Sequence, residues 1–415
     1  MPTKIQAIQA RRILGAHGEA TLEVDVLLEG GVVGRAAVTA AESAALGHRD
    51  LPAVGRINHE MAERLVGMDA ADQAALDEAM IDADGTADKS RFGPDATLGV
   101  SIAAARAASV AAGEPLYEYL GGTEAVTLPV PTIHLLHPGG AVDFRAFLVQ
   151  PWGAPSFSAA LRMGIDVFDA LGTVLQEKGY GAPVGDDGAW APSLRANHEA
   201  PELILQAIER AGFRPGEEIW LALAPAAGDL ARQARHRGRE GYCFFRSDPD
   251  RVATAEEMVD LWAGWVEKYP IRSIEDGLAG DDWAGWKTLT DRLGRRVQLL
   301  GDELFAGDAR LLQRGIDEGC ANGAVIHPGQ IGTLTETLSA IDLVMGCGRA
   351  AVLTDGPGEP EDTTLADLTV ARNTGQIKAG GADRSGRVGT VNQLLRIEEA
   401  LGNRAVYGAS TWNKG

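Results

Sequence analysis

The chain has 415 residues, a net charge of −20, 45% hydrophobic residues and 23% charged residues. This length suffices for a large barrel or for two domains with full cores. The acidity, with no local lysine or arginine cluster, argues against nucleic-acid binding, because phosphate contacts need a basic surface. No apolar run approaches the roughly 20 residues that span a bilayer, and the N-terminus lacks a signal-peptide core. We therefore expect a cytoplasmic protein with no membrane or nucleic-acid partner.

The N-terminal part predicts strands followed by helices. Residues 1–35 alternate between apolar and polar side chains up to a turn at residues 29–31, which predicts antiparallel strands. From Ile57 to about Gly113 the pattern is helical, and the small side chains of residues 96–112 suit tight helix–helix packing. Prolines at 129 and 131 then interrupt the pattern. We predict an α+β domain over residues 1–125 and a second domain over residues 126–415.

Short apolar strands alternate with helices in the second domain. The predicted strands are residues 146–149, 219–223, 271–274, 298–300, 323–326 and 350–353. Repeated strand–helix units over this length indicate a β/α barrel of the α/β class rather than an open doubly wound sheet. The chain has no GxGxxG after a first strand and no P-loop, which argues against a nucleotide-binding fold.

The residues that directly follow the strands matter most, because barrel enzymes place their chemistry at the carboxyl ends of the strands. These residues are Asp187, Ala224, Glu275, Asp302, His327 and Asp355, with Lys378 at the end of a later strand. Carboxylates, a histidine and a lysine that converge on one barrel mouth predict a metal site or a proton-transfer site. Each residue alone is more often a helix cap or a salt-bridge partner, so the prediction depends on their joint position.

Specific motifs run along the chain from about residue 5 to residue 408. They are residues 273–276 (SIED) with 281–283 (DDW), 375–378 (GQIK) with 392–399 (NQLLRIEE), 84–86 (DGT) with 98–101 (LGVS), and 330–333 (QIGT) with 361–363 (EDT). These motifs resemble those of the enolase (phosphopyruvate hydratase) family. The resemblance implies an enolase-type β/α barrel, an α+β N-terminal capping domain and a homodimer.

The resemblance also implies a division of labour. In enolases, two Mg²⁺ ions neutralise a carboxylate while a lysine removes the neighbouring proton and a glutamate protonates the leaving hydroxyl. Glu275 and Asp302 match two Mg²⁺ ligands of the family, and Lys378 matches a lysine of its site. Ala224 stands where the family has a third ligand, an aspartate. Because Mg²⁺ needs near-octahedral oxygen coordination, we expect a weakened Mg²⁺ site.

Other positions of the family's machinery are changed. Asp187 replaces the acid glutamate, Ala146 replaces a second glutamate, and His327 replaces the base lysine. Residues 354–359 (TDGPGE) replace the phosphate clamp S-H-R-S-G-E and put Asp355 among them. A carboxylate in place of cationic donors repels a phosphate. We therefore expect the chain not to dehydrate 2-phosphoglycerate.

Two loops that close over the family's site are shorter here. Residues 39–45 (TAAESAA) stand in place of one of them, and Ser43 is a candidate for the serine that contacts the second Mg²⁺. The second loop, which bears a histidine in the family, is deleted between Gly140 and Asp143. Loops that close over an active site exclude water and complete the site. The loss of these loops therefore argues against the reaction that enolases catalyse.

Two functions remain open from the sequence, and the residues do not decide whether the chain is an enzyme. The first is a lyase or transferase that acts on a small oxygenated carboxylic acid. His327, oriented by Asp355, is its candidate general base, because imidazole exchanges protons near neutral pH. Lys378 and a cation would hold the acid, and Asp187 is a further candidate catalytic residue.

The second function is a non-catalytic one, in which a pseudoenolase acts as a binding or scaffolding protein. For the enzyme, the resemblance suggests one setting in specialised metabolism, the biosynthesis of phosphonate and phosphinate natural products. There an enolase homologue is assigned as carboxyphosphonoenolpyruvate synthase. The changed phosphate clamp argues against such a substrate.

Overall fold

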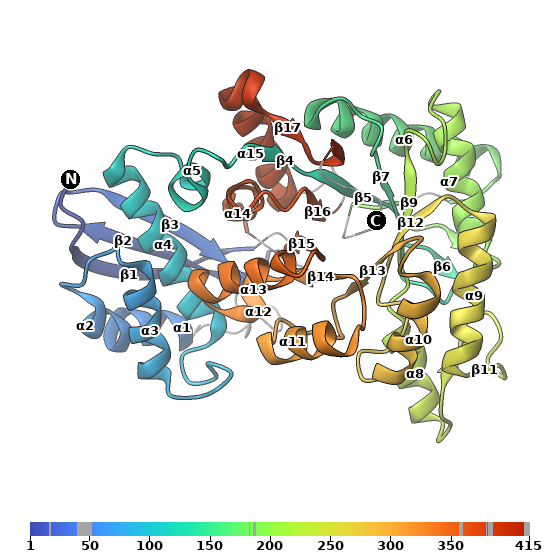
Figure 1. Ribbon diagram of the computed structural model, residues 1–415, viewed down its shortest axis with the longest axis horizontal. Helices are drawn as coiled ribbons and strands as arrows, with labels where there is room; N and C mark the ends of the chain where they lie inside the picture. The colour runs from blue at the N-terminus through green and yellow to red at the C-terminus, as the bar shows by residue number, and fades with distance from the viewer. Residues whose placement is uncertain are drawn as a thin grey trace.

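The computed structural model describes residues 1–15, 18–39, 52–181, 183–185, 188–356, 360–378, 380 and 385–410. A strand-and-helix domain at the N-terminus lies beside an eight-stranded closed barrel (Figure 1). The predicted α/β class, with a β/α barrel and a smaller N-terminal α+β domain, is confirmed.

The N-terminal domain is a three-stranded antiparallel sheet covered by helices. Its strands are β1 (Ile5–Leu14), β2 (Ala20–Leu28) and β3 (Val33–Val38). Its helices are α1 (Pro52–Arg56), the π-helical turn η1 (Ile57–Met61), α2 (Ala62–Leu65), α3 (Gln73–Asp84), α4 (Pro94–Ala112) and α5 (Leu116–Gly121). The alternating pattern of β2 buries Leu22, Val24 and Val26, as one covered face of a sheet requires.

The small residues of α4 pack mainly against a sheet. We expected them to serve helix–helix packing, but α4 packs chiefly across β2 and β3. The approach is so close that a Cβ atom on Gly34 would lie 2.1 Å from the carbonyl oxygen of Ala103. Alanines and glycines therefore allow this helix to lie directly on the strands.

The barrel closes in the order β12-β13-β14-β15-β16-β5-β7-β9. Its strands in chain order are β5 (Val130–Leu136), β7 (Ala146–Gln150), β9 (Trp220–Ala224), β12 (Ile271–Glu275), β13 (Gln298–Gly301), β14 (Gly323–Ile326), β15 (Ala350–Thr354) and β16 (Gln376–Lys378). The six strands predicted from the sequence agree with β7, β9 and β12 to β15 to within one residue at each end. The sequence did not predict β5, because its second residue is Pro131, and proline is tolerated only near the start or edge of a strand.

One barrel strand runs against its neighbours. β7 pairs antiparallel with both β5 and β9, whereas all other neighbouring barrel strands are parallel. The first residue of β7, Ala146, pairs with the last residue of β9, Ala224. The start of β7 therefore lies at the same mouth of the barrel as the ends of the parallel strands.

Ten helices among the described residues accompany the barrel strands. They are α6 (Phe157–Glu177), α7 (Glu199–Arg210), α8 (Ala227–His236), α9 (Ala255–Lys268), α10 (Trp283–Leu293), α11 (Ala309–Glu318), α12 (Pro328–Ile331), α13 (Leu334–Gly346), α14 (Thr364–Ala371) and α15 (Ser385–Leu401). The starts of α11 and α13 follow from their caps, because Asp308 and Thr333 accept hydrogen bonds from the first turns. None of the helices that the structure describes is long and apolar enough to cross a membrane.

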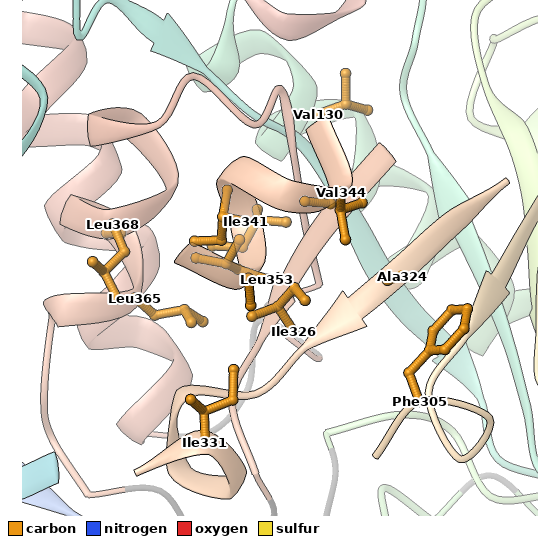
Figure 2. Packing of buried hydrophobic residues seen from close by; sticks show 14 of the residues in the cluster. Val130, Phe305, Ala324, Ile326, Ile331, Ile341, Val344, Leu353, Leu365 and Leu368 are labelled. Atoms are coloured by element: carbon orange, nitrogen blue, oxygen red, sulfur yellow. The ribbon is translucent and has the colours of Figure 1, made fainter. Parts of the chain in front are cut away.

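Short elements complete the chain. They are β4 (Thr127–Leu128), β6 (Gly139–Gly140), β8 (Ser193–Leu194), β10 (Tyr242–Cys243), β11 (Val252–Ala253), β17 (Val406–Tyr407) and the 3₁₀ turns η2 (Gly402–Arg404) and η3 (Gly408–Ser410). The core is continuous from strands to helices: Ile326 and Leu353 of neighbouring strands lie near Ile341 and Val344 of α13 (Figure 2). All four side chains are buried.

Charged groups join the two domains beside the barrel mouth. Arg106 of α4 forms an ion pair of 2.7 Å with Asp362, just before α14. Asp77 of α3 accepts a hydrogen bond of 2.9 Å from the backbone N–H of Thr335, in the first turn of α13. A carboxylate at a helix N-terminus is favourable because unpaired N–H groups and the helix dipole meet it there. These contacts fix the N-terminal domain next to the ends of β14 and β15.

Candidate active site

A cavity of about 270 Å³ lies at the carboxyl ends of the parallel barrel strands. The predicted site residues in its wall are Glu275, Asp302, His327, Asp355 and Lys378. Two further predicted residues, Asp187 and Ser43, lie outside the residues that the structure describes. The structure therefore brings together the five predicted site residues that it describes, and the role of each remains a prediction.

Lys378 and Glu275 form a buried ion pair across the barrel mouth. Lys378 ends β16 and Glu275 ends β12, and their Nζ and Oε1 atoms lie 2.6 Å apart. The side chains are 15% and 11% exposed, so water screens the pair poorly. Burial lowers the pKa of Lys378, but the charge and hydrogen bond of Glu275 outweigh it, and the pKa lies above its usual value. The lysine therefore stays charged at neutral pH.

His327 contacts the second predicted metal ligand. Its Nε2 lies 3.3 Å from Oδ2 of Asp302, which directly follows β13. His327 precedes α12, and Pro328 suits the first position of that helix. Burial raises the pKa of Asp302, but the hydrogen bond and charge interaction with His327 outweigh it and hold the pKa below its usual value. We expected Asp355 to orient this ring; Asp355 lines the same cavity, and the contact described for the ring is with Asp302.

Two family models match almost the whole chain. The model described as the enolase N-terminal domain matches residues 5–120, and that of the enolase C-terminal TIM barrel domain matches residues 125–414. The chain belongs to the enolase family. Enolases bind Mg²⁺ at a cluster of acidic residues, and this family member has such a cluster at the mouth of its barrel.

That cluster contains a third carboxylate, Asp276, for which the sequence motifs predicted no role. Asp276 follows Glu275 and has a backbone φ of +47°. Residues other than glycine rarely adopt a positive φ. It accepts hydrogen bonds from the backbone N–H groups of Asp302 (2.9 Å) and Glu303 (3.1 Å). Asp276 therefore ties the end of β12 to the turn after β13. Its position in the SIED motif was the available signal, but a strand pattern does not show which backbone groups a following residue contacts.

Burial is the largest influence on the pKa of the Asp276 carboxyl group. Together with the negative charges of Glu275 and Asp302, burial raises the pKa of Asp276 well above its usual value. The two backbone hydrogen bonds act in the opposite direction and do not compensate. A neighbouring cation would relieve this concentration of negative charge.

The donor set fits a divalent cation such as Mg²⁺. Ligand oxygens of Glu275, Asp276 and Asp302 lie within 4.8 Å of one another. Carboxylate oxygens are the ligands that Mg²⁺ prefers. Glu275 and Asp302, the ligands predicted from the sequence, would hold the ion, and the backbone hydrogen bonds of Asp276 would fix the turns that carry them.

An apolar wall adjoins the acidic cluster in this enolase-family protein. Ala146, Leu148, Ala222 and Ala224 form a small hydrophobic cluster on β7 and β9. Ala146 and Ala224, at which the resemblance predicts replaced family carboxylates, are direct cross-strand neighbours. The structure thus places two methyl groups side by side at the mouth of the barrel.

Three further polar residues that were not predicted from the sequence line this cavity. His134, in β5, and His137, just beyond it, went unnoticed because β5 was not predicted. Arg145, just before β7, pairs with Asp229 at 2.7 Å. Arg145 and Lys378 are the only lysine or arginine side chains among the described residues that line this cavity, and both are paired with carboxylates.

Proposed function

We propose that this enolase-family protein is an enzyme that removes the proton next to the carboxylate of a small, non-phosphorylated oxygenated acid. One observation supports the proposal above all. Lys378 contacts Glu275 while His327 contacts Asp302, so a cation and a candidate base flank the same pair of carboxylates in one cavity. A base and a positive charge near the substrate carboxylate are the two groups that enolate formation needs.

In the proposed step, the ammonium group of Lys378 binds the carboxylate of the acid. A neutral imidazole that donates from Nε2 to Asp302 has its lone pair on Nδ1. Nδ1 of His327 then accepts the proton from the carbon next to the carboxylate, and the C–H electron pair moves onto the carboxylate. A Mg²⁺ ion on Glu275 and Asp302, when bound, would neutralise the charge that accumulates there. The wall formed by Ala146 and Ala224 excludes water from one side of this step.

The charges of the site support a substrate without phosphate or phosphonate. Asp355 and Gly356, which the resemblance assigns to the altered phosphate clamp, line a cavity beside the barrel mouth. Lys378 and Arg145 are the only lysine or arginine side chains among the described residues of the cavity wall, and each already donates to a protein carboxylate. The three N–H donors of Lys378 suffice for Glu275 and one substrate carboxylate, whereas a phosphate dianion needs several cationic or N–H donors. A phosphonate intermediate of natural-product biosynthesis is therefore not part of this proposal. The homodimer of the family remains our prediction for the assembly.

The proposal is tested by proton exchange. In D₂O with Mg²⁺, NMR should show loss of the C2 proton signal from at least one simple 2-hydroxy acid, while 2-phosphoglycerate yields no phosphoenolpyruvate. Samples without protein give the background rate. Dehydration of 2-phosphoglycerate at rates typical of enzymes, roughly 1–10³ s⁻¹, would contradict the proposal. An absence of exchange across a panel of 2-hydroxy and 2-amino acids would favour the non-catalytic pseudoenolase.

We also propose that the missing third carboxylate weakens the Mg²⁺ site. The substitution Ala224→Asp should tighten Mg²⁺ binding by on the order of tenfold, because ligand charge and number set the affinity of such sites. Isothermal titration calorimetry with MgCl₂ measures the change. Ala226→Asp is the matched control, because Ala226 lines the same cavity but does not occupy the ligand position. Equal gains in the two variants would show a general charge effect and contradict the assigned position.

A further inference from the structure

A second cavity, of about 350 Å³, lies between the N-terminal domain and the barrel. We call it the interdomain chamber. Its aliphatic and proline wall comes from β3, α4, α12 and α14: Val38, Leu98, Ile102, Pro328, Leu365 and Leu368. Figure 2 shows Leu365 and Leu368 on the same helix, α14. The chamber therefore needs both domains, and neither forms it alone.

The chamber and the cavity at the barrel mouth share a wall. His327, Thr354 and Asp355 line both of them. The candidate base therefore stands where the two cavities meet. A molecule whose reacting carbon lies at His327 has the carboxylate cluster on one side and the chamber on the other.

The chamber's chemistry suits an uncharged, apolar group. Among the described residues that line it there is no lysine or arginine, so an anion finds no cationic partner in this part of the wall. Three carboxylates also line it, those of Asp95, Asp355 and Asp362. The charge of Asp362 is already balanced by Arg106 at 2.7 Å. Aliphatic side chains make up much of the remaining wall, as in most small-molecule sites.

We propose that the substrate is an amphipathic acid, a 2-oxygenated carboxylic acid with an aliphatic tail, and that the interdomain chamber binds the tail. This inference rests on the proposed function, which places the carboxylate at Lys378. The charges set the orientation: the carboxylate end stays with Lys378, and the apolar end extends past His327 between the domains. The cleft between the two domains thereby selects the substrate by chain length.

The test uses a series of straight-chain 2-hydroxy acids, from 2-hydroxypropanoate to 2-hydroxyoctanoate, titrated calorimetrically in the presence of MgCl₂. Affinity should rise about fourfold for each added methylene until the chamber is filled, because each buried methylene transfers apolar surface out of water. Affinity that is independent of length, yet lost in Lys378→Met, would overturn the chamber assignment and leave the proposed function standing. Affinity that rises with length but is unaffected by Lys378→Met would overturn the carboxylate position instead.

Two variants that reduce the chamber's volume sharpen the test. Leu98→Phe and Leu365→Phe, on helices of different domains, should each remove most of the gain from the longer acids and leave 2-hydroxypropanoate unaffected. Leu343→Phe is the control, because Leu343 is a half-buried leucine of α13 that lines neither cavity. Thermal unfolding identifies any variant that does not fold. A full length-dependent gain in both folded chamber variants would overturn the inference.

Discussion

Replacement of His327 by glutamine is expected to slow C2 proton exchange by about 10²–10⁴-fold while the dissociation constant of the acid changes by less than about threefold. Glutamine keeps a polar group that reaches Asp302 but has no nitrogen that accepts a proton near neutral pH. A residue that acts only in the transition state affects the rate and leaves binding unchanged. NMR exchange rates in D₂O, together with calorimetric titrations of the same acid, separate the two effects.

His134→Gln is the matched control for this prediction. His134 lies in the wall of the same cavity on β5, and the proposed step gives it no proton to transfer. Its substitution should leave the exchange rate within about threefold of the parent, the range of an indirect effect on the site. If His134→Gln abolished exchange and His327→Gln did not, the base would be assigned to the wrong histidine.

Replacement of Lys378 by methionine is expected to have the largest combined effect on stability and binding. It leaves the carboxylate of Glu275, whose side chain is 11% exposed, without its cation. Removal of one member of a buried ion pair destabilises a protein by about 3–5 kcal/mol, because the remaining charge has lost both water and partner. Urea unfolding measures this loss in the absence of added Mg²⁺, and calorimetry should show that acid binding is lost as well.

A double variant tests whether the uncompensated charge of Glu275 causes the loss of stability. Glu275→Gln in the Lys378→Met background removes the uncompensated charge and should recover most of the lost stability, without restoring acid binding. Lys268→Met serves as the surface control, since the Lys268–Glu202 pair is exposed and its loss should leave the unfolding midpoint unchanged. If the Lys378→Met protein had the same free energy of unfolding as the parent, the Lys378–Glu275 ion pair would not contribute to the stability of the barrel.

Much of the barrel could be predicted because strand positions follow from local patterns. Short apolar runs bounded by glycine and acidic residues agree with β9, β12 and β13 to within one residue at each end. The position of Glu275, Asp302 and Lys378 at strand ends followed from the same pattern. β5 escaped prediction because Pro131 is ordinarily a breaker, and His134 and His137 were overlooked with it.

The sequence by itself determined the family, the α/β barrel and the residue types that stand at the ends of the barrel strands. Only the tertiary structure decided which of those residues meet. It gave His327 a contact with Asp302 and joined Asp276 to the turn after β13. It also made neighbours of Ala146 and Ala224, because β7 runs antiparallel. The physical reason is that strand patterns are local, whereas contacts between strand ends depend on strand direction, register and barrel closure.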